Sequence, residues 1–201
     1  MTSSNRFHPL NGGELEIAST ALQFRDLFKV ADKAYVDIIE VLEFRVAEFI
    51  PDFRLMVRRD VELDTLAQTT IDPPRIFVKE SIYDAACEGD ADARRVLAHE
   101  LGHLLLHQRI TTPMQRDTTG YFDQFPLMNL LDSSEAQADV FARHFLIPPY
   151  LAFDSRFDCD ILARRTGTSK SLSSAAIAVS KRQEMYALRQ PRRSAPKHKL
   201  P

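Results

Sequence analysis

The chain has 201 residues, of which 44% are hydrophobic, and this suits a single domain with a sizeable apolar core. Its 26 Lys and Arg residues nearly balance 28 Asp and Glu residues, so the formal net charge of −2 argues against a chain-wide basic surface for nucleic acid. Two cysteines without ligand or redox spacing (Cys87 and Cys159), no apolar run near ~18 residues and no apolar signal segment indicate a cytoplasmic protein with no membrane span.

The N-terminal quarter of the chain predicts a flexible start followed by helix. Residues 1–13 are polar and end in a Gly-Gly pair, so we expect them to be flexible. Apolar residues at helical spacing predict helix over 14–33 and again over 34–50. Asp32 or Asp37 marks a break between two helices, or one long helix runs through both segments.

Three short segments predict a small sheet. Residues 53–59 alternate apolar and polar side chains, which indicates a strand with one buried face, and 63–70 and 75–79 predict two further strands. One edge of this sheet either pairs with an extended peptide by strand addition or simply completes the core, and the sequence does not choose the edge. A short helix is predicted from Ser81 to near Gly89.

The motif H-E-x-x-H lies in the next predicted helix, residues 93–108, for which Asp90 is a suitable N-cap. His99 and His103 are four residues apart, so both rings leave the same helix face and can reach one zinc ion. Glu100 lies beside the metal position, where it can accept a proton from the attacking water. An almost wholly apolar helix with histidines along one stripe favours this interpretation over a chance pattern on the surface.

A second helix, predicted before Pro148-Pro149, supplies the remaining groups of the site. Glu135 is our candidate for the third zinc ligand. Asp139 lies one turn later. There it can accept a hydrogen bond from a ligand histidine, through the N–H of the ring nitrogen that does not bind the metal. This hydrogen bond fixes the tautomer of the histidine. Ala138 is small where the two helices would approach each other closely. Alone, Glu135 and Asp139 would indicate only a solvated helix face, but after H-E-x-x-H they indicate a metal site.

The segments H-E-L-G-H-L-L-L-H and S-E-A-Q-A-D-V-F-A-R-H-F-L-I-P-P resemble the ImmA/IrrE zinc metallo-endopeptidases, most closely over residues 72–149. The resemblance implies an α+β, zincin-like fold with N-terminal helices, a small twisted sheet, two metal-binding helices and a C-terminal helix pair. It implies one Zn²⁺ per chain on His99, His103 and Glu135, with Glu100 as general base. It also implies a protein substrate, a helix-turn-helix repressor or antitoxin whose cleavage derepresses a mobile element, a toxin–antitoxin pair or a stress response.

Three further residues have open roles. The polar connection 109–130 forms either a flexible rim of the substrate cleft or a segment whose aromatic residues pack on the body, and its Tyr121 is a candidate donor to an oxyanion. His107 contacts the substrate or the ligand shell, or it is a cation at the helix C-terminus, the interpretation we favour. His144 lies on the wrong helix face for zinc and is expected to support or pack.

The C-terminal part predicts a helix pair and a tail. Residues 158–165 predict a short helix with Gly167 as C-cap, and Ser169 begins the next helix. A helix–turn–helix outline is also that of a DNA reader, but the second helix lacks a dense basic face, so we expect packing and no direct nucleic-acid binding. The basic, Pro-rich residues 190–201 are expected to be disordered, which leaves 14–189 as the metallopeptidase domain.

These observations predict a zinc-dependent endopeptidase of restricted specificity. The alternative is a non-proteolytic binding module that sequesters a repressor and keeps a structural or vestigial zinc site. Structural zinc sites are usually closed by four protein ligands, whereas only three are apparent here, and this favours the enzyme.

Overall fold

The computed structural model describes residues 13–107, 133–182, 185 and 188, which form helices and a small sheet. The helices are α1 (Glu14–Leu27), α2 (Ile38–Glu40), α3 (Glu80–Cys87), α4 (Ala91–Leu106), α5 (Ser134–Leu146), α6 (Pro149–Asp154), α7 (Cys159–Thr166) and α8 (Lys170–Ser180). The strands are β1 (Arg54–Arg58), β2 (Ala67–Thr70) and β3 (Arg75–Lys79). This mixture confirms the predicted α+β class.

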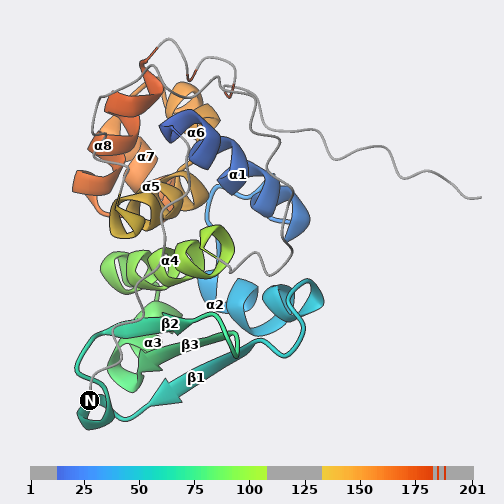
Figure 1. Cartoon of the computed structure of the whole chain (residues 1–201). Coiled ribbons are helices and arrows are strands. Elements are labelled where there is room, and N and C mark those ends of the chain that lie inside the picture. The colour runs from blue at the N-terminus through green and yellow to red at the C-terminus, as the bar shows by residue number, and fades with distance from the viewer. Residues whose placement is uncertain (1–12, 108–132, 183–184, 186–187, 189–201) are drawn as a thin grey trace, which may run out of the picture.

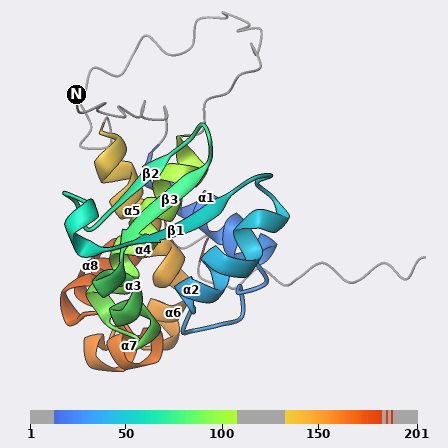
Figure 2. The same ribbon diagram turned by 90° about the horizontal axis from the view of Figure 1, so that it is seen from below.

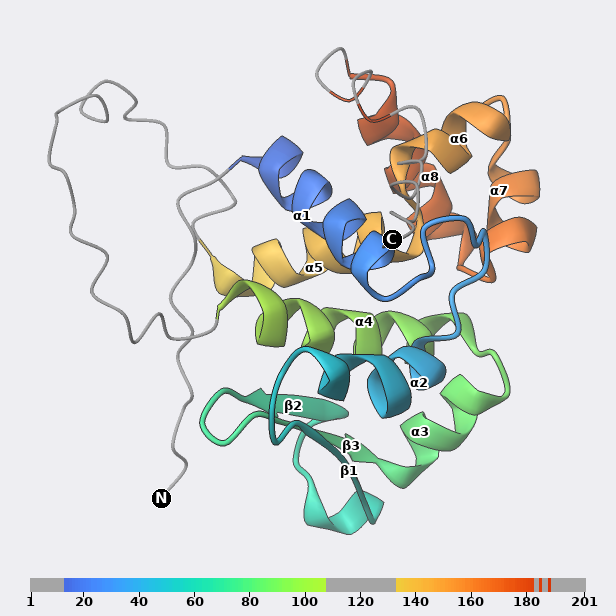
Figure 3. The same cartoon turned by 90° about the vertical axis from the view of Figure 1, so that its right-hand side faces the viewer.

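Helix α4 runs through the middle of the molecule (Figure 1). The sheet, α2 and α3 lie on one side of it, and α5 followed by α1 lies on the other (Figure 3). Seen from below, the strands lie in front of α4 (Figure 2). Helices α6, α7 and α8 gather at one end of α5.

The central position of α4 follows from its sequence. Leu97, Leu101 and Leu104 are fully buried, because the helix is apolar nearly all round and must be covered on several faces. The predicted N-cap is confirmed, since the Asp90 carboxylate accepts hydrogen bonds from the backbone N–H groups of the first turn at 3.0 and 2.8 Å. The helix that carries H-E-x-x-H is therefore enclosed by the protein on several faces and is capped at its start.

The sheet has the strand order β1-β3-β2, with β3 parallel to β1 and antiparallel to β2. The prediction of one buried face on the first strand is wrong at Val57, which is 40% exposed, because β1 is the edge strand farther from α4. Strand β2 is shorter than the predicted 63–70, and its inner side lies on α4. The edge strand nearest the motif is therefore β2.

Several helix boundaries differ from the predictions. The predicted helix 14–33 stops at the end of α1, because Lys29 adopts a left-handed backbone conformation with φ of 62°. The predicted helix 34–50 begins only at α2, where the Asp37 carboxylate caps the helix, and it continues as one π-helical and one 3₁₀ turn. Asp37 thus marks the break between two helices.

Two further boundaries were predicted incorrectly or missed. The helix predicted from Ser81 begins one residue earlier, and the backbone N–H of Ser81 donates to the carboxylate of Asp60 instead of to a capping residue next to the helix. Pro148-Pro149 ends the second metal helix as predicted, since α5 stops at Leu146 with Ile147 as its C-cap, but Pro149 also begins α6, a helix that was not predicted. Proline suits this first helical position because the missing N–H would have no partner inside the helix.

The predicted C-terminal helix pair is confirmed and packs on the body. Gly167 ends α7 with φ of 62°, and the Ser169 hydroxyl caps α8. Arg94, buried on α4, donates hydrogen bonds to the carbonyls of Gly167 and Val36 and stacks on the Tyr35 ring, 3.9 Å from its centroid. A Cβ on Gly167 would come within 2.5 Å of that ring, so only glycine fits this contact.

The predictions for the flexible ends (1–13 and 190–201) and for the connection 109–130 lie outside the described residues, apart from Gly13. Within the described part of the chain, every helix is too short or too polar to span a bilayer.

Candidate metal centre

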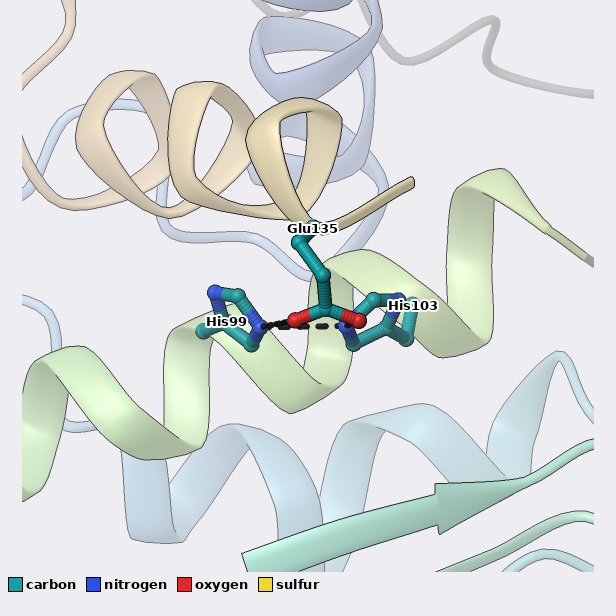
Figure 4. A group of neighbouring side chains, drawn as sticks. All are labelled: His99, His103 and Glu135. Atoms are coloured by element: carbon teal, nitrogen blue, oxygen red, sulfur yellow. Dashed lines mark hydrogen bonds and ion pairs between the residues drawn. The ribbon is translucent and has the colours of Figure 1, made fainter. Parts of the chain in front are cut away.

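Two histidines of α4 and one carboxylate of α5 converge on one point (Figure 4). The Nε2 atoms of His99 and His103 lie 3.0 Å apart. One carboxylate oxygen of Glu135 lies 3.2 Å from the Nε2 of His99, and the other lies 3.2 Å from the Nε2 of His103. The structure therefore brings together the three residues that the sequence selected as ligands, from two helices separated by the 27 residues 107–133.

This donor set fits a zinc ion. Two imidazole nitrogens and a carboxylate oxygen lie within 4.8 Å of one another. Ligand atoms bound at about 2.0–2.1 Å to a tetrahedral zinc are about 3.3 Å apart, close to the observed 3.0–3.2 Å. Three protein ligands leave one tetrahedral position for water or substrate, as in catalytic sites.

Close approach of the two helices makes this convergence possible. A Cβ built on Gly102 would lie 3.1 Å from the Cα of Ala138 and 3.2 Å from its carbonyl oxygen. The predicted small residue Ala138 therefore faces a glycine, and the backbones of α4 and α5 approach almost directly. A larger side chain at either position would move Glu135 away from the histidines.

The predicted general base, Glu100, is mostly buried on the sheet side of α4. The hydroxyl of Thr69 in β2 lies 2.7 Å from one carboxylate oxygen of Glu100 and 3.0 Å from its backbone carbonyl oxygen. Burial raises the pKa of Glu100, while the hydrogen bond from Thr69 and the proximity of His99 oppose that rise. The carboxylate is thus held beside the ligands by the edge strand and is not itself among the three converging donors.

The sequence matches the Peptidase_M78 family, described as the IrrE N-terminal-like domain, over residues 55–172, more than half of the chain. The chain belongs to this family. The match confirms the resemblance drawn from the two motifs, and with the structure it confirms a zincin-like metallopeptidase domain. A comparison with curated proteins found no match.

In this IrrE-like domain, Asp139 contacts His99, the geometry that the sequence predicted. Its carboxylate oxygen lies 2.9 Å from the Nδ1 of His99, the ring nitrogen that faces away from Glu135. Burial opposes a charge on His99, but the hydrogen bond and charge of Asp139 outweigh it and raise the pKa of this histidine. The same contact lowers the pKa of Asp139, and Arg95, 3.4 Å away, acts in the same direction.

The second candidate ligand, His103, has a different neighbour. The Nδ1 of His103 lies 3.2 Å from the Nδ1 of His107, whose Nε2 lies 3.0 Å from the Oε1 of Gln137. Burial lowers the pKa of His107 and, with the charge on His99, lowers that of His103 to about 4. His107 does occupy the C-cap of α4, but its buried side chain contacts the ligand shell, so it is not the helix-end cation that we favoured.

His144 has no contact with the metal centre. It is buried on α5, with its Nε2 3.5 Å from a carboxylate oxygen of Glu14 in the first turn of α1. Arg143 and Arg182 bind the same carboxylate, so Glu14 joins α1 to α5 and to the end of α8. His144 therefore packs between α5 and α1, in agreement with the packing role that the sequence predicted. Tyr121 lies outside the described residues.

Sequence reasoning missed two polar residues of this centre, Thr69 and Gln137. Thr69 lay inside a predicted strand, but its partner depends on which strand lies against α4. Gln137 offered no signal in the sequence beyond its place between the two carboxylates of α5, because its burial is visible only in the structure. For His107 a signal was present, because three histidines recur every four residues along one helix.

Proposed function

We propose that the protein is a zinc-dependent endopeptidase of restricted specificity, which cleaves a helix-turn-helix repressor or antitoxin. The observation that carries the proposal is the convergence of His99, His103 and Glu135 beside the buried carboxylate of Glu100. The family assignment supports a peptidase in general. The substrate class comes from the resemblance to ImmA/IrrE proteases.

In this proposal His99, His103 and Glu135 hold the zinc ion. A zinc ion at such a site polarises the scissile carbonyl and lowers the pKa of water. Glu100 accepts the proton of the attacking water and returns a proton to the leaving amine. Thr69 keeps the Glu100 carboxylate in place, and Asp139 keeps the Nε2 of His99 directed at the metal position.

Strand β2 supplies a means of aligning the substrate. Among the described residues β2 pairs only with β3, so the backbone groups on its other edge are available to an extended peptide. Thr69 of this strand contacts Glu100 directly, which places the edge beside the general base. A peptide added to β2 would therefore run past the reacting groups. An extended segment of a protein suits this arrangement better than a compact small molecule.

The test uses purified protein, a helix-turn-helix repressor or antitoxin encoded beside it, and casein as a general substrate. We expect cleavage of the repressor at one or two sites, dependent on zinc, and little digestion of casein. Broad digestion of casein would contradict restricted specificity. Stable binding of the repressor without cleavage, equal in the wild type and in Glu100→Gln, would contradict the peptidase and favour a non-proteolytic binding module.

A further inference from the structure

We propose that His107 is a positioning residue for the metal ligand His103, and that Gln137 holds His107 in the tautomer this role requires. The inference rests on the proposed function only in that His103 binds metal. In this arrangement His107 accepts a hydrogen bond from His103, as Asp139 does from His99, but His107 and Gln137 are neutral groups.

The ring of His103 presents one nitrogen to the metal position. Its Nε2 is the ring nitrogen that faces His99 and Glu135, at 3.0 and 3.2 Å. A neutral imidazole that binds metal through Nε2 carries its proton on Nδ1, and a buried N–H needs an acceptor. His103 is 3% exposed, so its neighbours in the protein must provide that acceptor.

His107 supplies it in only one of its tautomers. Its Nδ1 lies 3.2 Å from the Nδ1 of His103, so one of the two nitrogens donates and the other accepts. With the proton on His103, the Nδ1 of His107 must be bare and its proton must sit on Nε2. That second N–H points at the Oε1 of Gln137, 3.0 Å away, and an amide oxygen can only accept. The two contacts thus select the same proton arrangement.

The surroundings keep this relay in place. His107 is 6% exposed and Gln137 is fully buried, so water competes little for their hydrogen bonds. The backbone N–H of His107 donates to the carbonyl oxygen of His103 at 3.1 Å, which fixes the end of α4 where the two rings meet. A carboxylate at this depth would require a compensating positive charge, whereas a neutral imidazole and amide do not. Asp139 takes the corresponding position on the exposed side, where a charge is tolerated.

The first test observes the protons directly. In zinc-loaded protein with ¹⁵N-labelled histidine, long-range ¹H–¹⁵N spectra distinguish a protonated ring nitrogen from a bare one. We expect His103 to carry its proton on Nδ1, and His107 to be neutral with its proton on Nε2. A proton on the Nδ1 of His107 would overturn the proposal.

The second test measures zinc affinity by competition with a chromophoric chelator, without reference to peptidase activity. His107→Leu removes the acceptor and should weaken zinc binding roughly 10–100-fold. His107→Asn places an oxygen near the former Nδ1 and should restore most of the affinity. Gln137→Leu should weaken binding less, and it should add nothing in a His107→Leu background, because Gln137 acts through His107.

His144→Leu is the matched control, since it also removes a buried histidine, but one that contacts Glu14 and not the centre. It should lower the free energy of unfolding and leave zinc affinity unchanged. Equal losses of zinc affinity in His107→Leu and His144→Leu, or no rescue by His107→Asn, would overturn the relay. Cleavage of the repressor with unaltered zinc affinity in His107→Leu would refute the relay alone. The predicted affinity losses without any cleavage would refute the peptidase alone.

Discussion

Replacing Glu14 by Gln tests whether one partly buried carboxylate holds α1 against the helix that carries Glu135. Burial alone would raise the pKa of Glu14, but His144, Arg143 and Arg182 outweigh it and lower the pKa from 4.5 to about 2. A shift of this size corresponds to about 3 kcal/mol of stability at neutral pH. Because Arg182 is 54% exposed and its interaction is screened, we expect a loss of about 2–3 kcal/mol in Glu14→Gln.

The pH dependence gives this prediction its sign. The pKa of Glu14 is lower in the folded than in the unfolded protein, so its contribution is complete above pH 4.5 and is lost as the pH falls toward 2. Urea unfolding of the metal-free protein between pH 7 and pH 3 should show the difference between wild type and Glu14→Gln shrinking to about half. Glu16→Gln, an exposed carboxylate in the same first turn of α1, is the control. Equal stabilities of the two variants across this range would refute the reasoning.

Three further predictions concern the centre itself. Thr69→Val removes the hydrogen bond to Glu100 and should lower kcat about tenfold with little change in KM. Thr69→Ser keeps the hydroxyl and should keep the wild-type rate. Equal rates in both variants would show that Thr69 has no role in the site. Asp139→Ala should weaken zinc binding roughly 10–100-fold in chelator competition, and unaltered binding would make Asp139 an ordinary surface carboxylate. Gly102→Val should separate α4 from α5. It should lower the free energy of unfolding by about 1–3 kcal/mol and weaken zinc binding. If neither quantity changed, the two helices would not be closely packed at this position.

The metal ligands could be selected from the sequence because their geometry is largely local. His99 and His103 belong to one helix, and a spacing of four residues places both rings on one face whatever surrounds them. Glu135 needed more, since a carboxylate on a separate helix indicates a metal site only because it follows H-E-x-x-H in the chain. The helix cap at Asp90 and the turn at Gly167 could also be predicted from the sequence, because each depends only on one residue and the backbone next to it.

The residues that were missed depend on tertiary contacts. The strand order β1-β3-β2 places Thr69 on α4, and no pattern in a four-residue strand reveals that order. The close approach of α4 and α5 depends on Gly102 as well as on Ala138. In the sequence alone, a glycine inside a helix indicates only lower helix stability, and not a contact with another helix. His107 was interpreted as a cation because its position at the helix end was visible and its burial was not.

The most direct test of a metal-dependent peptidase compares wild type, Glu100→Gln and Glu135→Gln in parallel, measuring zinc content and repressor cleavage on the same samples. We expect one zinc per chain in the wild type and in Glu100→Gln, because the general base is not a ligand, and reduced zinc content in Glu135→Gln. Cleavage should fall about 10²–10⁴-fold in Glu100→Gln, since an amide cannot accept the proton of the attacking water. Undiminished cleavage by Glu100→Gln, or full zinc content in Glu135→Gln, would contradict the account.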